Sequence, residues 1–177
     1  MLILHNIQNI QMNYFELFGL PIGFKVDTTL LRTAFMDIQK ASHPDKFTQA
    51  SEDEQTQALE NSAIANKAYT LLNNADNVMP YVLEVTGYLE SEEKYALKPD
   101  FLMEMMDLNE AWMDASDEAE KSKIIEKVKN IDNEIHSPVK KLLETPSIDS
   151  ISQEGMLQIK DYYYKKKYLD RILADFR

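Results

Sequence analysis

Three consecutive residues, His43, Pro44 and Asp45, carry side chains suited to recognising another protein. Histidine can donate or accept hydrogen bonds, and aspartate accepts them from arginine or lysine. The proline restricts the backbone between them, so the two polar side chains keep a defined orientation. The same three residues also fit an ordinary turn, because proline and aspartate are common turn formers.

The rest of the chain offers little for catalysis, metal binding or nucleotide binding. Acidic pairs such as Glu92 and Glu93 lie in an expected loop, with no histidine or nucleophile placed beside them by the pattern. The chain has no cysteine, and its histidines, at positions 5, 43 and 136, lack the helical pairing of a metal site. It also lacks a phosphate-binding loop. We therefore predict no enzyme activity, no metal site and no cofactor.

Composition and charge narrow the class of protein further. Of the 177 residues, 44% are hydrophobic, which is enough for one or two domains with a real core. The net charge of −11 repels phosphate backbones and argues against a nucleic-acid partner. No apolar run is long enough to cross a membrane. Residues 1–12, which we interpret as an N-terminal extension, lack the basic residues of a signal peptide. These features predict a cytoplasmic protein with no membrane partner.

The elements around His43 are expected to form a helical hairpin. A short helix near residues 14–18 precedes a helix that Asp27 caps and that ends near Ser42, because a proline disfavours helical geometry at the residue before it. A long helix follows over 52–73, with small residues at steps of four and three that suit close packing. The hairpin places the histidine at its exposed tip, and the short helix braces it. The apolar stripe of the first long helix consists of Leu31, Ala34, Phe35 and Ile38.

The second half of the chain is expected to form a bundle of three helices, over about 99–113, 117–135 and 152–176. Prolines break the chain between the last two of them. Since no strand pattern of useful length occurs, we predict an all-α fold with an N-terminal hairpin domain and a C-terminal three-helix bundle. The predicted parts are an extension over 1–12, the hairpin domain over 13–76, a connector over 77–98 and the bundle over 99–177.

The first helix of the bundle carries two apolar strips. A helix in a three-helix bundle faces one core, so the second strip either stays exposed as a partner site or packs beneath the hairpin domain or inside the bundle. Methionine adapts well to irregular partner surfaces. Residues 90–134 hold 14 acidic and six basic residues, which is usually a solvated surface but can also steer a basic partner. The core strip is Phe101, Met105, Leu108 and Trp112, and the second strip is Leu102, Met103 and Met106, flanked by Asp107 and Glu110.

The order of residues in the first half resembles the J-domain, the module of the DnaJ family. Tyr14-Phe15, the amphipathic helix, His43-Pro44-Asp45-Lys46-Phe47 and Ala68-Tyr69 follow one another as in that family. There, the loop and the helix before it bind a DnaK-class chaperone and stimulate its ATP hydrolysis. Ser42 departs from the family, which usually has an aromatic residue at this position. The resemblance implies that His43, Pro44, Asp45, Arg32, Lys40 and Lys46 bind the chaperone.

The resemblance extends into the second half. A J-domain joined to a short acidic helical bundle, without a glycine-rich linker or zinc domain, resembles the HscB family of iron–sulfur co-chaperones, and Phe101-Leu102-Met103-Glu104 is the most specific match. It implies an HscA-like DnaK-family chaperone and an IscU-like scaffold protein as partners, in the maturation of iron–sulfur clusters. The implied scaffold-binding residues are Leu102, Met103, Met106, Asp107, Glu110 and Tyr168. Two alternatives are a general J-domain protein that binds varied unfolded clients and a plain helical structural protein, which the tip motif disfavours.

Overall fold

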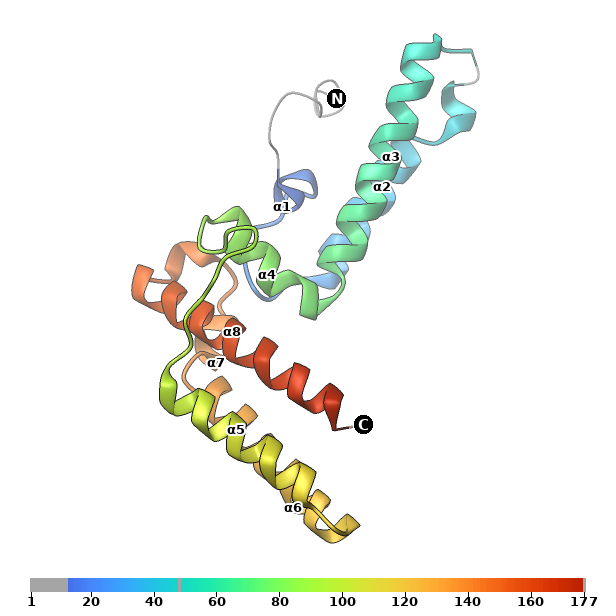
Figure 1. Ribbon diagram of the computed structural model, residues 1–177. Coiled ribbons are helices and arrows are strands. Elements are labelled where there is room, and N and C mark those ends of the chain that lie inside the picture. Colours follow the sequence, from blue (N-terminus) through green and yellow to red (C-terminus); the bar gives the residue numbers. More distant parts are fainter. Residues whose placement is uncertain (1–12, 48, 177) are drawn as a thin grey trace. The chain divides into compact units, whose positions relative to one another are not determined.

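The computed structural model describes residues 13–47 and 49–176, and every regular element in these ranges is a helix (Figure 1). The all-α prediction is confirmed. The predicted N-terminal extension, residues 1–12, lies outside the described residues. In chain order the elements are α1 (Tyr14–Leu17), α2 (Thr28–Ala41), the 3-10 turn η1 (Pro44–Phe47), α3 (Glu52–Leu72), α4 (Ala75–Val85), α5 (Pro99–Asp114), α6 (Glu118–His136), α7 (Lys140–Leu143), the 3-10 turn η2 (Ile148–Ser150) and α8 (Gln153–Asp175).

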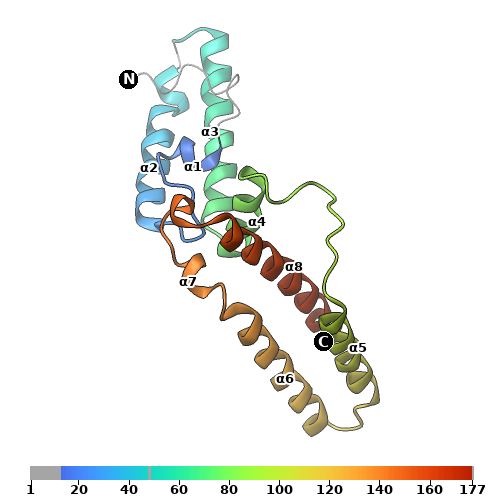
Figure 2. The same cartoon turned by 90° about the vertical axis from the view of Figure 1, so that its left-hand side faces the viewer.

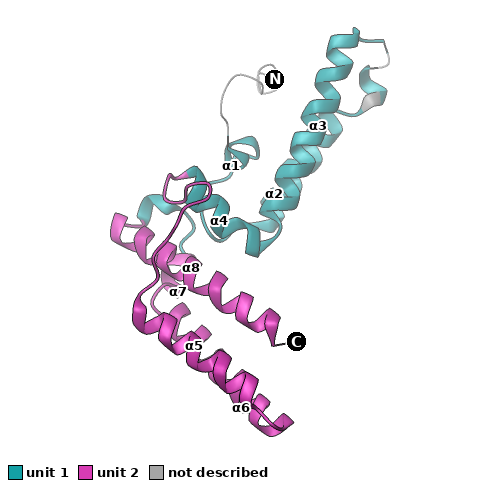
Figure 3. Cartoon of the chain, in the orientation of Figure 1, with its two compact units in different colours: residues 1–85, 145–150 teal, residues 86–144, 151–177 magenta. Residues whose placement is uncertain are grey.

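The helices divide into two compact units (Figure 3). Among the described residues, the first comprises those up to 85 together with 145–150, and the second comprises 86–144 together with those from 151 onward. Helix α4, which covers the first part of the predicted connector, belongs to the first unit, and residues 86–98, called the connector from here on, belong to the second. The chain also returns to the first unit for six residues before α8 begins, a return that the sequence pattern does not reveal.

Helices α2 and α3 lie side by side as an antiparallel hairpin in the first unit (Figures 1 and 2). The side chain of Asp27 accepts hydrogen bonds from the backbone N–H groups of Thr29 and Leu30 at 2.9 and 3.0 Å, which starts α2 at the predicted place. Ser51 and Glu54 form a reciprocal capping box that starts α3. Local side chains thus set where the two long helices of the hairpin begin.

The core of the first unit joins the hairpin to the brace helix α1 and to α4. Leu31 is the one fully buried residue of the predicted α2 stripe, whereas Phe35 is half-buried and stacks on Tyr69 with ring centroids 4.3 Å apart. Tyr81 of α4 stacks on Tyr14 at 5.0 Å and accepts a hydrogen bond from its backbone N–H at 2.7 Å. The buried residues of this core are Phe15, Leu17, Phe18, Leu31, Ala68, Leu72, Val78 and Val82.

Residues 145–150 are attached to the first unit by backbone and side-chain contacts. The N–H of Ile148 donates a hydrogen bond to the carbonyl of Ile22 at 2.9 Å, and the Ile148 side chain packs on the core of that unit. Gly23 lies so close to this segment that a Cβ there would be 2.5 Å from the Pro146 carbonyl oxygen. Only glycine fits without moving backbone, since no flexible side chain can yield at this contact.

We expect Gly23→Ala to destabilise the first unit by about 1–3 kcal/mol, the usual cost of forcing extra volume into a packed site. A denaturant melt followed by circular dichroism measures the change. The control Lys25→Ala replaces an exposed residue two positions away and is expected to stay within about 0.5 kcal/mol of the parent. Equal stability of the two variants would show that the 145–150 segment is not held against Gly23.

The second unit is a bundle of α5, α6 and α8, as predicted. The predicted core strip of α5 faces inward: Phe101, Met105 and Leu108 are buried, and Trp112, partly buried, stacks on Phe176 with centroids 4.4 Å apart. Helices α6 and α8 also carry buried apolar residues at helical spacing. Each of the three helices therefore contributes one apolar stripe to a common core. The buried set is Phe101, Met105, Leu108, Ile124, Val128, Ile131, Leu169, Ile172 and Phe176.

The connector 86–98 is fastened to α8 by a cluster of polar and aromatic side chains. The Tyr95 hydroxyl donates a hydrogen bond to Asp161 at 2.9 Å, and the Tyr164 hydroxyl donates one to Glu93 at 3.3 Å. Glu93 also forms an ion pair with Lys160, and the rings of Tyr95 and Tyr164 stack at 4.4 Å. The sequence alone indicated only a charged loop here. Burial, followed by the neighbouring carboxylates, raises the pKa of both Tyr95 and Tyr164 to about 12.

These raised values make the connector sensitive to high pH. A tyrosine whose pKa is higher in the folded than in the unfolded state stabilises the fold fully below the unfolded value of 10.0 and loses that contribution as pH rises towards about 12. We expect stability in denaturant melts to fall over this range. Tyr95→Phe should remove one late step from an ultraviolet titration of the phenols and cost about 0.5–1.5 kcal/mol at neutral pH. The control Tyr88→Phe removes another phenol from the same connector, and the titration of Tyr95→Phe is compared with it. Loss of no late step in Tyr95→Phe would contradict the assignment.

Candidate partner-binding sites

The tip of the hairpin presents His43 between the end of α2 and η1, which Pro44 begins. Its side chain is 59% exposed. The backbone N–H of Lys46 donates to the His43 carbonyl at 3.0 Å, and the N–H of Asp45 points at the imidazole Nδ1 at 3.3 Å. The predicted loop is therefore a tight 3-10 turn, and the backbone N–H of Asp45 in this turn contacts the His43 ring.

The contacts within the tip involve Nδ1 of the imidazole, which leaves Nε2 as the ring nitrogen for a partner. A neutral ring whose Nδ1 accepts a hydrogen bond carries its proton on Nε2, so Nε2–H becomes the donor available to a partner. The Asp45 carboxylate lies 3.5 Å from Nδ1, and this contact is an ion pair only when the ring is protonated. Both side chains are exposed. The tip thus offers one directed donor and one carboxylate acceptor, as partner recognition requires.

The last turn of α2 is fixed to α3 next to this tip. Gln39 donates to Asn66 at 3.2 Å and to the Ser62 carbonyl at 3.4 Å, and the Ser62 hydroxyl donates back to Gln39 at 2.9 Å. Ser42, which ends α2, is buried, and its N–H donates to the Ile38 carbonyl at 2.9 Å. These contacts hold the tip in one place relative to the hairpin. Sequence reasoning missed the Gln39 link, because it joins residues 23 positions apart in the chain.

The three cations predicted to assist the tip, Arg32, Lys40 and Lys46, are all exposed. Arg32 and Lys40 lie eight residues apart on α2, about 12 Å along its axis. Lys40 is 3.9 Å from the exposed carboxylate of Asp37, a surface pair that contributes little to stability and leaves the ammonium accessible. The arrangement places positive charge along α2 as well as at the tip, which suits an acidic partner surface.

The second strip of α5 is exposed over most of its length. Met103 and Met106 are 62% and 66% exposed, and the rim residues Asp107 and Glu110 are exposed as well. Leu102 is half-buried, so it contributes to packing and to the surface together. Within the second unit the two methionines therefore lie on the surface of the bundle and not inside it.

Tyr168 lies on α8 and is half-buried against the core of the bundle. Its ring meets Phe101 edge to face at 6.2 Å, and the Arg171 guanidinium lies 4.6 Å from the ring centroid. Because Phe101 directly precedes Leu102, the structure brings Tyr168 close to the start of the exposed strip. Arg171 is an adjacent group that sequence reasoning did not single out; its spacing of three residues from Tyr168 is the signal that could have indicated it.

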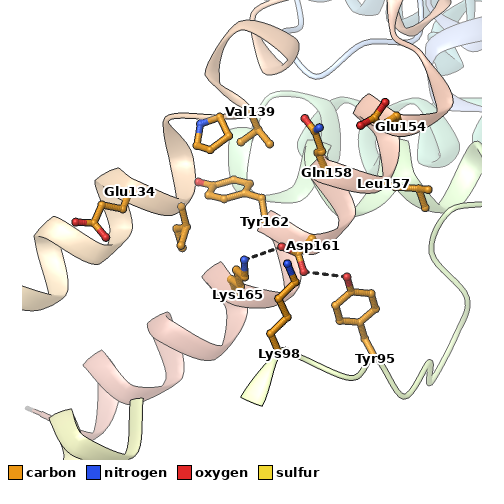
Figure 4. A pocket seen from close by; sticks show the side chains of 12 residues that line it. Tyr95, Lys98, Glu134, Val139, Glu154, Leu157, Gln158, Asp161, Tyr162 and Lys165 are labelled. Carbon is orange, nitrogen blue, oxygen red and sulfur yellow. Dashed lines mark hydrogen bonds and ion pairs between the residues drawn. The ribbon is translucent and has the colours of Figure 1, made fainter. Parts of the chain in front are cut away.

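An open groove of about 490 Å³ lies in the second unit, between the end of the connector, α6 and α8 (Figure 4). Tyr162 and Val139 form part of its apolar wall. Part of its polar side consists of groups that already bind one another, since Asp161 accepts from Tyr95 and forms an ion pair with Lys165 at 2.7 Å. The groove therefore contains a satisfied structural cluster, and we assign no ligand to it. In residues 13–47 and 49–176, no helix is long and apolar enough to span a membrane.

Comparisons with known proteins place these observations in a family. The profile described as "HSCB C-terminal oligomerisation domain" matches residues 97–177, the second unit's bundle. The solved structure "Chaperone HscB from Vibrio cholerae" is similar over 93% of this chain and 95% of its own, with 31% identity and a TM-score of 0.60. The chain belongs to the HscB family. The hairpin with its brace helix is thus a J-domain fold followed by the HscB helical bundle, as predicted.

Two further HscB relatives show the extent of the similarity. The human co-chaperone protein HscB, known from a crystal structure, has a TM-score of 0.67 with 28% identity over 94% of this chain and 81% of its own. Among curated sequences, the "Co-chaperone protein HscB homolog" of Vibrio atlanticus (strain LGP32) is 41% identical over 110 residues, or 62% of this chain. That of Vibrio cholerae serotype O1 (strain M66-2) is 43% identical over 100 residues, or 56%. The chain spans 64% and 58% of the length of these two curated relatives.

Proposed function

We propose that this chain is a co-chaperone that stimulates the ATPase of an HscA-like, DnaK-family chaperone and delivers an IscU-like scaffold protein to it, in the maturation of iron–sulfur clusters. The observation that carries the proposal is the presence of two different recognition surfaces on one HscB-family chain. One is the His43–Asp45 tip, and the other is the exposed methionine strip of α5. The chain acts as an adaptor in this proposal, and the chemistry belongs to the chaperone.

The tip and the cations on α2 supply the contact with the chaperone. The imidazole Nε2–H and the Asp45 carboxylate are directed groups on a tightly held turn, and Arg32, Lys40 and Lys46 add positive charge. Such groups favour encounter with an acidic surface and fix the orientation of the complex. We assign this role to the domain over residues 13–76.

The bundle over residues 99–177 supplies the contact with the scaffold. Leu102, Met103 and Met106 form its apolar centre, Asp107 and Glu110 form an acidic rim, and Tyr168 extends it on α8. An apolar centre with a polar rim is the usual anatomy of a protein interface. The acidic rim adds a preference for a partner with basic side chains.

A coupled ATPase assay tests the proposal directly. The chaperone's ATP hydrolysis is measured alone, with the chain, with an IscU-like scaffold, and with both together. We expect the chain to stimulate hydrolysis and the scaffold to increase the stimulation further at limiting concentrations of the chain, because binding both proteins raises the local concentration of the client. Absence of stimulation in both conditions that contain the chain would refute the adaptor role.

The flexible methionine strip also suits a general co-chaperone for unfolded clients, because methionine repacks against varied surfaces. Competition separates the two functions. Under the adaptor proposal, an excess of a permanently unfolded protein leaves scaffold binding unchanged, whereas a general client site would release the scaffold.

A further inference from the structure

Met113 is an exposed apolar side chain that the predicted scaffold-binding strip does not include. It is 84% exposed, more than Met103 or Met106. It follows Met106 by seven residues, which on a helix brings it within about 20° of the same direction and about 10 Å further along the axis. Met113 therefore adds an exposed apolar group on the last turn of α5, about 16 Å from Leu102 along the axis, with the polar residues Asn109 and Glu110 on the turn between it and Met106.

The Met113 side chain is not part of the core at this end of the bundle. Its neighbour Trp112 fills the core side, stacking on Phe176 at 4.4 Å, and the Lys121 ammonium lies 5.6 Å from the Trp112 ring centroid. Single exposed methionines are ordinary on protein surfaces. A third one on the same side of the same helix as Met106 instead extends the face that carries the strip, with Glu110 between the two methionines.

The charge of α5 indicates what covers this surface. The helix carries five acidic residues and no lysine or arginine. Two copies of the chain facing each other through α5 would bring like charges together, which disfavours a second copy as the occupant. A segment with apolar side chains flanked by lysine or arginine matches both the exposed methionines and the charge.

We propose that Met113 forms the C-terminal end of the scaffold-binding surface, where it contacts an apolar side chain of a scaffold segment that carries basic residues beside it. This inference rests on the proposed function, because the scaffold is the partner. It assigns α5 a contact surface that runs from Leu102 to Met113. Met113 is a specificity-determining residue in this arrangement, because a partner whose apolar segment is long enough to reach it binds more tightly than one with a shorter segment.

Isothermal titration of an IscU-like scaffold into the full chain tests the inference. We expect Met113→Ala to weaken binding about 3- to 30-fold, from the loss of part of one buried methionine. Met113→Lys should weaken it more, because a cation then meets the basic segment, whereas Met113→Leu should keep most of the affinity. Leu157→Ala is the matched control: Leu157 is 50% exposed on α8 of the same unit and does not belong to the α5 strip, so its replacement should leave the titration unchanged.

The outcomes separate this inference from the proposed function. If Met106→Ala weakens scaffold binding but all three Met113 variants bind like the parent, the extension is wrong and the strip ends at Met106. If the parent chain fails to bind the scaffold, both are wrong. If sedimentation shows a dimer of the parent that Met113→Ala dissociates while its scaffold titration is unchanged, a second copy occupies this surface and the inference is overturned. Equal melting temperatures of all variants establish that the fold is not the cause.

Discussion

His43→Gln is expected to abolish the stimulation of a DnaK-class chaperone's ATPase by this chain. Glutamine is polar and of similar reach, but it lacks the ring that the Asp45 N–H holds at Nδ1 and that directs Nε2–H outward from that contact. Removing one partner from a desolvated hydrogen-bonded pair costs about 2–5 kcal/mol. Stimulation at limiting chain concentration should therefore fall roughly 30-fold or more.

The fold should not change in this variant, because His43 is exposed and its replacement is expected to alter stability by no more than about 0.5 kcal/mol. The measurement is the steady-state ATPase rate of the chaperone at increasing chain concentration, with a thermal melt of the same protein. His136→Gln, in the second unit, serves as the control and should stimulate normally. A well-folded His43→Gln chain that stimulates like the parent would exclude the tip as the chaperone contact.

The sequence predicts those parts of the fold that depend on local chemistry. Asp27 starts α2 because a carboxylate can cap the free N–H groups of the next turn, and Pro44 ends it because of steric conflict with the preceding residue. The core positions Phe101, Met105 and Leu108 follow from helical spacing alone. Each of these inferences uses residues no more than a few positions apart.

Contacts between distant parts of the chain could not be predicted in this way. The connector is held by Glu93 and Tyr95 through residues of α8 that lie more than 60 positions later, and no periodic pattern marks such a pairing. The return of residues 145–150 to the first unit depends on the absence of a side chain at Gly23, which a single glycine in a sequence does not reveal. The 3-10 turn at the tip likewise depends on hydrogen bonds that only the folded backbone makes.

In the candidate sites, too, the sequence predicted what local helix geometry determines and missed what depends on packing between helices. The direction of Met103 and Met106 away from the core followed from the angle between residues on a helix, and their exposure agrees with it. The half-burial of Leu102 did not follow, because it depends on how the neighbouring helices pack at the edge of the strip. This difference decides which residues can test the scaffold site cleanly: the two methionines can be replaced without a loss of core packing, whereas Leu102 cannot.

The double variant Met103→Ala/Met106→Ala is therefore expected to lose scaffold affinity while keeping its stability. A few anchors supply most of the affinity of an interface, so the loss should be roughly 1–4 kcal/mol, from several-fold to about a thousand-fold in the dissociation constant. Stability should change by no more than about 0.5 kcal/mol, since both side chains are mostly exposed. Leu108→Ala, which empties a buried position on the same helix, should instead cost about 2–5 kcal/mol of stability.

Three measurements on each variant separate binding from folding: a scaffold titration by calorimetry, a denaturant melt, and stimulation of the chaperone's basal ATPase. The double variant should still stimulate the basal rate, because the tip lies in the other unit and is unchanged. It should lose the additional stimulation that the scaffold provides. If the double variant melts early, as Leu108→Ala does, the methionines pack against other parts of the protein in solution. The strip would then be part of the fold, and the scaffold would have to bind elsewhere on the chain.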